Sequence, residues 1–261
     1  MTDPGGPHWK GKVVIVTGGA RGVGAATCTH FAQLGAQVVS TDVLAEQGQE
    51  HIAQLEAQGL NARFIAGDIA SEDHVRALID STAQAFGRID LLVNNAAILT
   101  AHDRPEDFSM SELRRVVEID LMGPLMATHL AAPIMARGGG GNVVNIASTG
   151  AIMEIPVSPV YSAAKAGILG FTRSMAAALA PSKVRVNALA PSLIDTAMTA
   201  GSELHTRKAA MQPADIARAI DCVASQLDVS GTFFTVRNTP SGVRLSRLVD
   251  PPEEQMLDMV V

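Results

Sequence analysis

The sequence predicts an α/β fold: a single domain built on a doubly wound parallel sheet of about seven strands with helices on both faces. Short runs of branched apolar residues alternate with longer segments rich in Ala, Leu, Glu and Gln over residues 11–236. Several of these runs lack polar alternation, which is typical of strands buried on both faces of a parallel sheet. Strict alternation of strand and helix favours parallel pairing through right-handed crossovers.

The first expected strand, 12–17, runs into a glycine-rich turn and then a helix that ends at Gly35. The remaining expected strands are 37–42, 62–66, 89–93, 142–147, 183–187 and 231–236. The remaining expected helices are 46–58, 71–86, 111–136, 161–179 and 213–226. Pro124 and Pro133 predict a kink or break in the longest helix. Ligands bind such sheets at the carboxyl ends of the strands, near the reversal in strand order.

Composition excludes several classes of protein. The chain is 47% apolar with a net charge of −6, and its basic residues are scattered, so neither a nucleic acid nor a membrane surface is an expected partner. No run approaches the length of a membrane span, and the N-terminus lacks an apolar signal core, so we expect a cytoplasmic protein. Cys28 and Cys222 show no disulfide or metal-ligand spacing, and no metal is expected. Residues 1–10 are expected to form a flexible lead-in, and 237–261 an atypical tail that packs on the domain or on an oligomer partner.

Glycines 18, 22 and 24 join the first strand to its helix. Glycine permits a tight turn and the approach of a pyrophosphate to the helix N-terminus, where free N–H groups favour anions. An ordinary strand–helix turn is the alternative interpretation. Asp42, at the end of the second strand, can accept hydrogen bonds from an adenosine ribose and would repel a 2′-phosphate, which favours NAD. Arg21 argues for NADP, but it is less well placed than the acid.

Ser148 follows an expected strand, and Tyr161 and Lys165 lie in the first turns of the next expected helix. Residues four apart share one helix face, so the phenol and the ammonium can point into one space. A nearby cation favours phenolate, and we therefore expect the pKa of Tyr161 to lie below its ordinary value. Taken alone, a tyrosine at this spacing is more often a packed amphipathic side chain.

The chain resembles the classical short-chain dehydrogenase/reductase family over roughly residues 10–236. The matching pieces are Thr17-Gly-Gly-Ala-Arg-Gly-Val-Gly24, Asp68, Asn94-Asn-Ala-Ala97, Ser148, Tyr161-Ser-Ala-Ala-Lys165 and Val186-Asn-Ala-Leu-Ala-Pro191. Each piece is weak alone, but six in this order and strand context are jointly specific. The resemblance implies a Rossmann-like fold, a nicotinamide cofactor and a dimer or tetramer.

The resemblance also implies roles for individual residues. Tyr161 would exchange a proton with the carbinol or carbonyl oxygen, Ser148 would hydrogen-bond that oxygen, and Lys165 would hold the nicotinamide ribose and activate the tyrosine. The implied cofactor contacts are Gly18, Arg21, Gly22, Val23, Gly24, Asp42, Val43, Asp68, Ile69, Asn94, Ala96, Tyr161, Lys165, Pro191, Ile194 and Thr196.

The sequence departs from the family pattern in three places. Asp120 stands where the family usually carries an asparagine that supports a proton-relaying water. Its carboxylate can still accept from water or Lys165, and we expect it to take part in catalysis while raising the pKa of Tyr161. Ala97 and Ser192 replace glycines. The family's acidic, double-glycine ending is replaced by a segment that begins at Arg237.

The expected substrate is a hydrophobic secondary alcohol or its ketone, because the residues that would line its pocket are mostly apolar. Ile98, Ile152 and Met153 are the main candidates beside Ser148 and Tyr161, and Ile155, Val157 and the loop 192–211 are further ones. Several of these could instead be core residues. The leading hypothesis is an NAD-dependent alcohol dehydrogenase or ketone reductase, and the alternative is a non-catalytic NAD-binding sensor or scaffold on the same fold.

Overall fold

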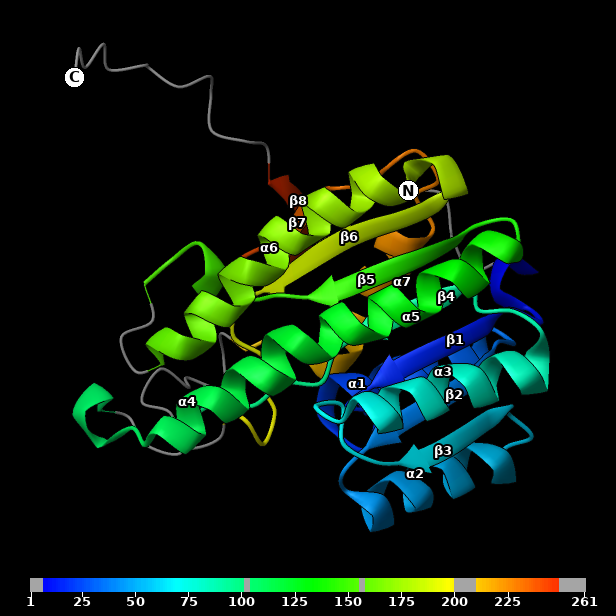
Figure 1. Ribbon diagram of the computed structural model, residues 1–261, viewed down its shortest axis with the longest axis horizontal. Coiled ribbons are helices and arrows are strands. Elements are labelled where there is room, and N and C mark those ends of the chain that lie inside the picture. The colour runs from blue at the N-terminus through cyan, green and yellow to red at the C-terminus, as the bar shows by residue number, and fades with distance from the viewer. Residues whose placement is uncertain (1–6, 101–103, 155–157, 200–209, 249–261) are drawn as a thin grey trace.

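The computed structural model describes residues 7–100, 104–154, 158–199 and 210–248. Their strands form one eight-stranded sheet in the order β3-β2-β1-β4-β5-β6-β7-β8. Its first seven strands run parallel, as expected, and β8 pairs antiparallel with β7 (Figure 1). The strands are β1 (Val13–Thr17), β2 (Gln37–Asp42), β3 (Ala62–Ala66), β4 (Leu91–Asn94), β5 (Gly141–Ile146), β6 (Val184–Pro191), β7 (Phe233–Thr239) and β8 (Gly242–Leu248). The strand order reverses between β1 and β4.

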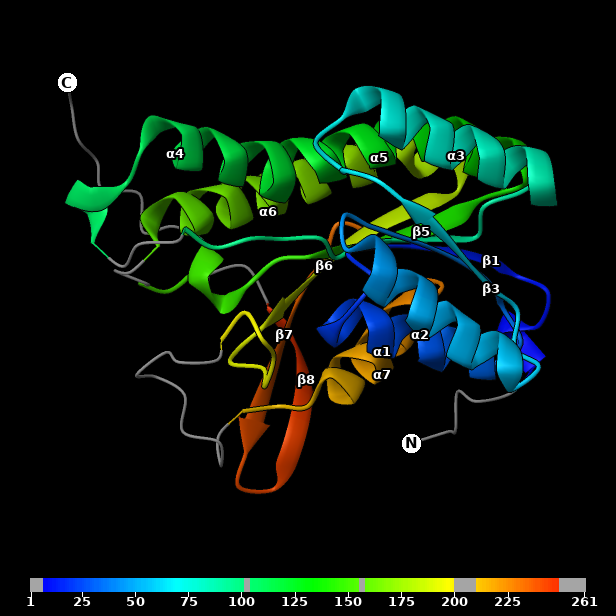
Figure 2. The same cartoon turned by 90° about the horizontal axis from the view of Figure 1, so that it is seen from below.

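Helices cover both faces of the sheet (Figure 2). They are α1 (Gly22–Gln33), α2 (Ala45–Ala57), α3 (Glu72–Phe86), α4 (Met110–Val117), α5 (Gly123–Arg137), α6 (Pro159–Leu179) and α7 (Pro213–Ala224). Helices α1, α2 and α7 pack on one face, and α3, α5 and α6 pack on the other, each with its own apolar core. Ser71 caps α3 by accepting a hydrogen bond from the His74 N–H, as its position in the sequence predicts.

Trp9 departs from the expectation for residues 1–10. Residues 7–9 form a 3-10 turn, and the Trp9 ring is buried against Phe31 with only 2% of its surface exposed. Its Nε1–H donates to Asp221 at 2.7 Å, which fastens this segment to α7. Residues 1–10 show no apolar periodicity, so the sequence carries no sign that Trp9 is buried or that it binds Asp221, 212 positions away.

The end of the sheet also differs from the expectation of about seven strands ending at residue 236. β7 continues to Thr239, and β8 returns beside it to form a hairpin that extends beyond the helical layers (Figure 2). Most β8 side chains are exposed, and Leu245 alone packs partly against a core cluster. An exposed edge strand needs no apolar run, so this part of the expected tail carries no strong strand pattern.

The long helix predicted around residues 111–136 breaks at one of the two prolines. A π-helical turn spans Glu118–Met122, and the Gly123 N–H donates to the Glu118 carbonyl five residues back. Pro124 has no N–H to bond to Asp120 four residues back, which accounts for the irregularity at this point. Pro133 lies inside α5, and the helix continues through it. This turn directs the buried Asp120 side chain toward α6.

By length and composition, Met110–Arg137 is the one segment of the described chain that could span a membrane, contrary to the expectation that no run would qualify. However, 56% of its most apolar window is buried inside the protein. It packs between α3 and α6, which is the usual position of a core helix.

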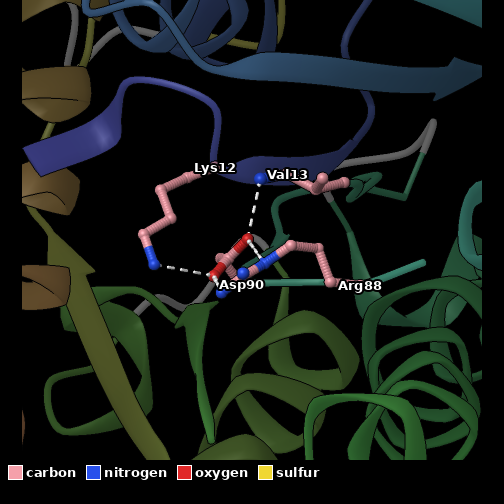
Figure 3. Close-up of polar contacts among 4 residues, drawn as sticks. All are labelled: Lys12, Val13, Arg88 and Asp90. Carbon is pink, nitrogen blue, oxygen red and sulfur yellow. Dashed lines mark hydrogen bonds and ion pairs between the residues drawn. The ribbon is translucent and has the colours of Figure 1, made fainter. Parts of the chain in front are cut away.

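The amino-terminal edge of the sheet is fastened by a cluster around Asp90 (Figure 3). Arg88 donates to both oxygens of this carboxylate, at 2.5 and 2.8 Å, and the Val13 N–H donates at 2.9 Å. Lys12 Nζ lies 3.2 Å away. Burial alone would raise the pKa of Asp90, but these hydrogen bonds outweigh it and hold the pKa below its ordinary value. The cluster ties the start of β1 to the start of β4, at the edge opposite the predicted site.

Candidate active site

The glycine turn after β1 lies at the reversal of the strand order. Gly18 and Gly22 have φ values of +68° and +57°, which favour glycine. A Cβ on Gly24 would lie 1.9 Å from the Gly18 carbonyl oxygen, so the third glycine is required for the turn to close on the helix. Arg21 is the N-cap of α1 but forms no side-chain cap. The first N–H groups of α1 therefore keep their capacity to bind a pyrophosphate, and this turn fits a dinucleotide.

Asp42 lies at the carboxyl end of β2, where the sequence predicts a ribose acceptor. Its Oδ2 accepts from the Ala20 N–H and its Oδ1 from the Leu44 N–H, both at 3.1 Å. Each oxygen retains a lone pair for a further donor. Val43 follows with 60% of its surface exposed, and Arg21 is exposed as well.

The side-chain contacts of Asn94 and Asn95, at the end of β4, differ from the expected ones. Asn94 does not present its amide at the sheet edge: it is buried and donates to Asn145 Oδ1 at 2.7 Å and to Thr128 Oγ1 at 3.1 Å. Asn95 instead reaches the glycine turn, donating to the carbonyls of Thr17 and Gly18. Alternation along β4 directs the Asn94 side chain toward α5, where its amide is engaged, so its expected ribose contact would be made by the backbone.

Three further expected contacts, Ala96, Asp68 and Ile69, follow β4 or β3. The Ala96 Cα would be only 2.8 Å from a Cβ on Gly18, so Ala96 closes one side of the turn. Asp68 follows β3 and accepts from the Ala70 N–H and from Arg115 of α4. Ile69 is buried against Gly123. Burial opposes ionisation of Asp68, but its hydrogen bonds and Arg115 outweigh this and lower its pKa.

The segment after β6 supplies the other side of the predicted cofactor site. Pro191 is buried at the end of β6 and pairs with Val236. Ile194 forms an isolated bridge with Met211. The Thr196 side chain faces Gly22, since a Cβ there would lie 3.5 Å from Thr196 Cγ2. The structure therefore places Thr196 across from the glycine turn.

The predicted catalytic residues meet at the carboxyl edge of β5. Lys165 Nζ donates to the Ile146 carbonyl at 3.1 Å and lies 5.5 Å from the Tyr161 ring centroid. Its nitrogen is 3.3 Å from Asp120 Oδ2, an ion pair that lacks the alignment of a hydrogen bond. Asp120 Oδ1 accepts from the Ile98 N–H at 2.9 Å. The ionic side chains are almost fully buried, at 2% exposure for Lys165 and 0% for Asp120.

The electrostatics of this cluster correct one expectation. Burial raises the pKa of Tyr161 above its ordinary value, and the charge of Asp120 adds to this effect. Lys165 and a hydrogen bond with Ser148 act in the opposite direction but do not outweigh burial. The expected lowering of the Tyr161 pKa is therefore wrong for the unliganded protein, whereas the expected opposition by Asp120 is confirmed. Burial likewise raises the pKa of Asp120.

A shallow, open cavity of roughly 730 Å³ is lined in the described part of the chain by Ala151, Ile152, Met153 and Glu154, which follow Ser148 closely in the sequence. Ile152 and Met153 are 40% and 56% exposed, so both are available to a ligand as expected. Ile98 is only partly exposed and packs against the core. Ile155, Val157 and residues 200–209 of the predicted pocket lie outside the described residues.

Sequence reasoning missed three residues near the site. Asn95 follows the predicted Asn94, and the period of two along β4 puts its side chain on the opposite face of the sheet, toward the glycine turn. Arg115 contacts Asp68 across 47 positions and gave no local signal. Arg237 contacts Met153 across 84 positions, and only its departure from the family ending marked it.

Comparison with known proteins places these features in a family. The sequence model described as short chain dehydrogenase matches residues 12–207. A cis-4-hydroxycyclohexanecarboxylate dehydrogenase of Sinomonas cyclohexanicum is 40% identical, over 77% of this chain and 82% of its own. A cyclopentanol dehydrogenase of a Comamonas species is 34% identical, over 91% of this chain and 94% of its own.

A solved dehydrogenase/reductase structure from Sinorhizobium meliloti 1021 superposes with a TM-score of 0.82 at 30% identity. The match covers 89% of this chain and 96% of that one. The family and the Rossmann-like fold imply a nicotinamide nucleotide cofactor. This chain belongs to the short-chain dehydrogenase family and is an oxidoreductase.

Proposed function

We propose that the protein is an NAD-dependent oxidoreductase that interconverts a hydrophobic secondary alcohol and its ketone. The observation that carries this proposal is the convergence of Ser148, Tyr161 and Lys165 at the carboxyl edge of the sheet. A protein that only binds a dinucleotide has no need of a phenol held beside a buried ammonium.

Tyr161 acts as the general acid/base in this proposal. In the direction of oxidation, its phenolate accepts the hydroxyl proton of the alcohol while Ser148 donates to the same oxygen. Lys165 is held by the Ile146 carbonyl and stabilises the phenolate through its charge. The bound nicotinamide supplies the acceptor for the hydride. Asp120 lowers the net positive charge near Tyr161, and so sets how easily the phenol ionises.

Asp42 supports NAD rather than NADP. The Asp42 carboxylate lies at the end of β2, where it would repel a 2′-phosphate, and its oxygens can accept from both ribose hydroxyls. Arg21 is exposed and forms no cap on α1. We propose that the pyrophosphate rests on Gly22, Val23 and Gly24 at the start of α1.

We further propose that the substrate carries an aliphatic ring. The cavity is open, and Ile152 and Met153 offer it apolar surface. The two curated relatives described above act, by their names, on cyclopentanol and on a hydroxycyclohexanecarboxylate. A compact aliphatic ring with one carbinol carbon suits a cavity with an apolar wall.

A homo-oligomer is the expected assembly. Met110, Val117 and Met122 expose 65%, 37% and 43% of their surfaces along one helical segment. The neighbouring α6 exposes small residues, which include Ala163 and Ala166. Apolar and small side chains on adjoining helices suit a helical interface with a second copy.

A non-catalytic NAD sensor is the second candidate, and one observation favours it. The pKa of Tyr161 is raised, partly by Asp120, so the unliganded protein holds little phenolate near neutral pH. Such a protein would retain the cofactor site and lose turnover.

The two candidates separate in one assay. We would follow nicotinamide absorbance with NAD and then NADP, offering cyclopentanol, cyclohexanol and 4-hydroxycyclohexanecarboxylate, with Tyr161→Phe as the control. Turnover with NAD should fall at least about a hundredfold in the control. Tight NAD binding by the wild type without turnover of any alcohol or ketone would favour the sensor.

A further inference from the structure

Arg237 lies in β7, near the carboxyl end of the parallel strands, and has no role in the proposed reaction. It follows Val236, which pairs with Pro191 and accepts a hydrogen bond from the Ser192 N–H at 2.9 Å. Side chains alternate along β7, so Arg237 shares a face with Phe233. Arg173 of α6 lies over the Phe233 ring, which identifies this as the α6 face of the sheet.

The guanidinium of Arg237 reaches the rim of the open cavity. Its Nη2 lies 3.9 Å from Met153 Sδ, and Met153 lines that cavity five positions after Ser148. A thioether sulfur is a weak acceptor. Within the described residues no carboxylate pairs with Arg237, and the contact with Met153 uses only one of its donors.

A second arginine stands directly opposite on the hairpin. Arg237 pairs with Arg244 in the antiparallel register of β7 and β8, so the two side chains lie on the same face. Arg244 makes one long contact, 3.4 Å, with Ser241 Oγ. Like charges directly opposite in a sheet destabilise it, and an anion held near both would offset this repulsion.

We propose that Arg237 is a specificity-determining residue that binds a carboxylate on the substrate, which makes the substrate a cyclic secondary alcohol or ketone with a carboxylate remote from the carbinol carbon. This inference rests on the proposed function and refines its substrate class. The planar guanidinium can bind a carboxylate through two parallel hydrogen bonds, and Arg244 adds positive field. Ile152 and Met153 contact the ring.

Glu154 provides an internal control, because it lines the same cavity and carries the opposite charge. A substrate carboxylate seated at Arg237 is repelled by Glu154 and attracted by the guanidinium. Substitutions at the two positions should therefore change the affinity for the acid in opposite directions, and neither should change the affinity for an uncharged analogue.

The kinetic test compares 4-hydroxycyclohexanecarboxylate with its carboxamide. Arg237→Gln should raise KM for the acid about tenfold, with kcat nearly unchanged, because it removes a charge-assisted hydrogen-bonded pair. Arg237→Lys should retain part of the affinity, Glu154→Gln should lower KM for the acid, and the carboxamide should respond to none of them. Equal changes for acid and amide in Arg237→Gln, or no change for either, would overturn the proposal.

A binding measurement keeps the test independent of turnover. Cyclohexanecarboxylate has no hydroxyl to oxidise, so its binding to the NAD-saturated protein can be followed by calorimetry even if no alcohol is a substrate. Arg237→Gln should weaken this binding about tenfold. If the wild type turns over no alcohol but its binding of cyclohexanecarboxylate still depends on Arg237, the proposed function is refuted and the carboxylate site is supported. If the wild type does not bind cyclohexanecarboxylate, or if Arg237→Gln binds it equally well, the proposed carboxylate site is refuted.

Discussion

Asp90 and Asp120 are both buried carboxylates beside a lysine, yet their environments push their pKa values in opposite directions. Asp90, at the amino-terminal edge of the sheet, receives hydrogen bonds from Arg88, Lys12 and the Val13 N–H. Asp120, at the carboxyl edge, receives one well-aligned hydrogen bond, from Ile98, and a poorly aligned ion pair with Lys165.

The difference separates a carboxylate whose hydrogen bonds stabilise the fold from one that lies beside Lys165 in the proposed active site. The depressed pKa of Asp90 contributes stability that is present above the unfolded pKa of about 3.9 and is lost as the pH falls through its folded value. The raised pKa of Asp120 acts in reverse: stability declines as the pH rises from about 3.9 toward the folded value, because the native state holds this proton more tightly.

The largest expected effect comes from removing the lysine of the buried pair. Lys165→Met leaves the Asp120 charge without its cation and should cost about 3 kcal/mol of unfolding free energy at pH 8. The cost should shrink at pH 5, where Asp120 can take up a proton. Urea unfolding at both pH values measures it. Lys12→Met, which weakens the more exposed Lys12–Asp90 contact, should cost under about 1 kcal/mol. If Lys165→Met and Lys12→Met lower the unfolding free energy equally, the Lys165–Asp120 and Lys12–Asp90 pairs do not differ as described.

Removing the structural carboxylate should cost less but still be measurable. Asp90→Asn weakens several charge-assisted hydrogen bonds and should lower the unfolding free energy by about 2 kcal/mol at pH 7. The difference in unfolding free energy between Asp90→Asn and the wild type should become smaller below pH 4, because the native Asp90 carboxylate becomes protonated. NAD binding and turnover should not change, and a loss of either would show that this cluster affects the active site.

Asp120→Asn should change catalysis more than stability. Without the negative charge, Lys165 acts more strongly on the phenol, so alcohol oxidation at pH 7 should accelerate roughly three- to tenfold. The rising limb of the pH–rate profile should move to lower pH. Asp90→Asn is the matched control and should leave the profile in place. Abolished turnover at every pH would instead give Asp120 a direct part in the proton transfer.

The smallest signal is spectroscopic. Tyr161 is the only tyrosine in the chain, so ultraviolet titration reports on a single phenol. In the unliganded wild type it should ionise above the ordinary value of about 10, because burial and Asp120 oppose the charged form. Asp120→Asn should bring the transition to lower pH, and Tyr161→Phe supplies the blank. A wild-type transition below 10 would restore the original expectation of activation by lysine alone.

Local patterns predicted the sheet well where each element carries its own signal. The strands at 37–42 and 62–66 have the expected bounds, and Ser71 caps its helix as expected. Prediction failed where the partner is remote. Trp9 is buried by α1 and α7, and β8 exists because β7 offers it an edge. The Asn94 amide binds Asn145, 51 positions away, and the expected contact of Asn94 with the cofactor stays a prediction.

By itself the sequence determined the strand–helix alternation, the glycine turn and the spacing of Tyr161 and Lys165. These features depend on backbone sterics and on one or two helical turns, so they can be recognised within short stretches of chain. The tertiary structure alone decided the balance of charge around the phenol, the pairing of Asp120 with Lys165, and the approach of Arg237 to the cavity. Desolvation and Coulomb interactions depend on distances through space, and only packing sets these.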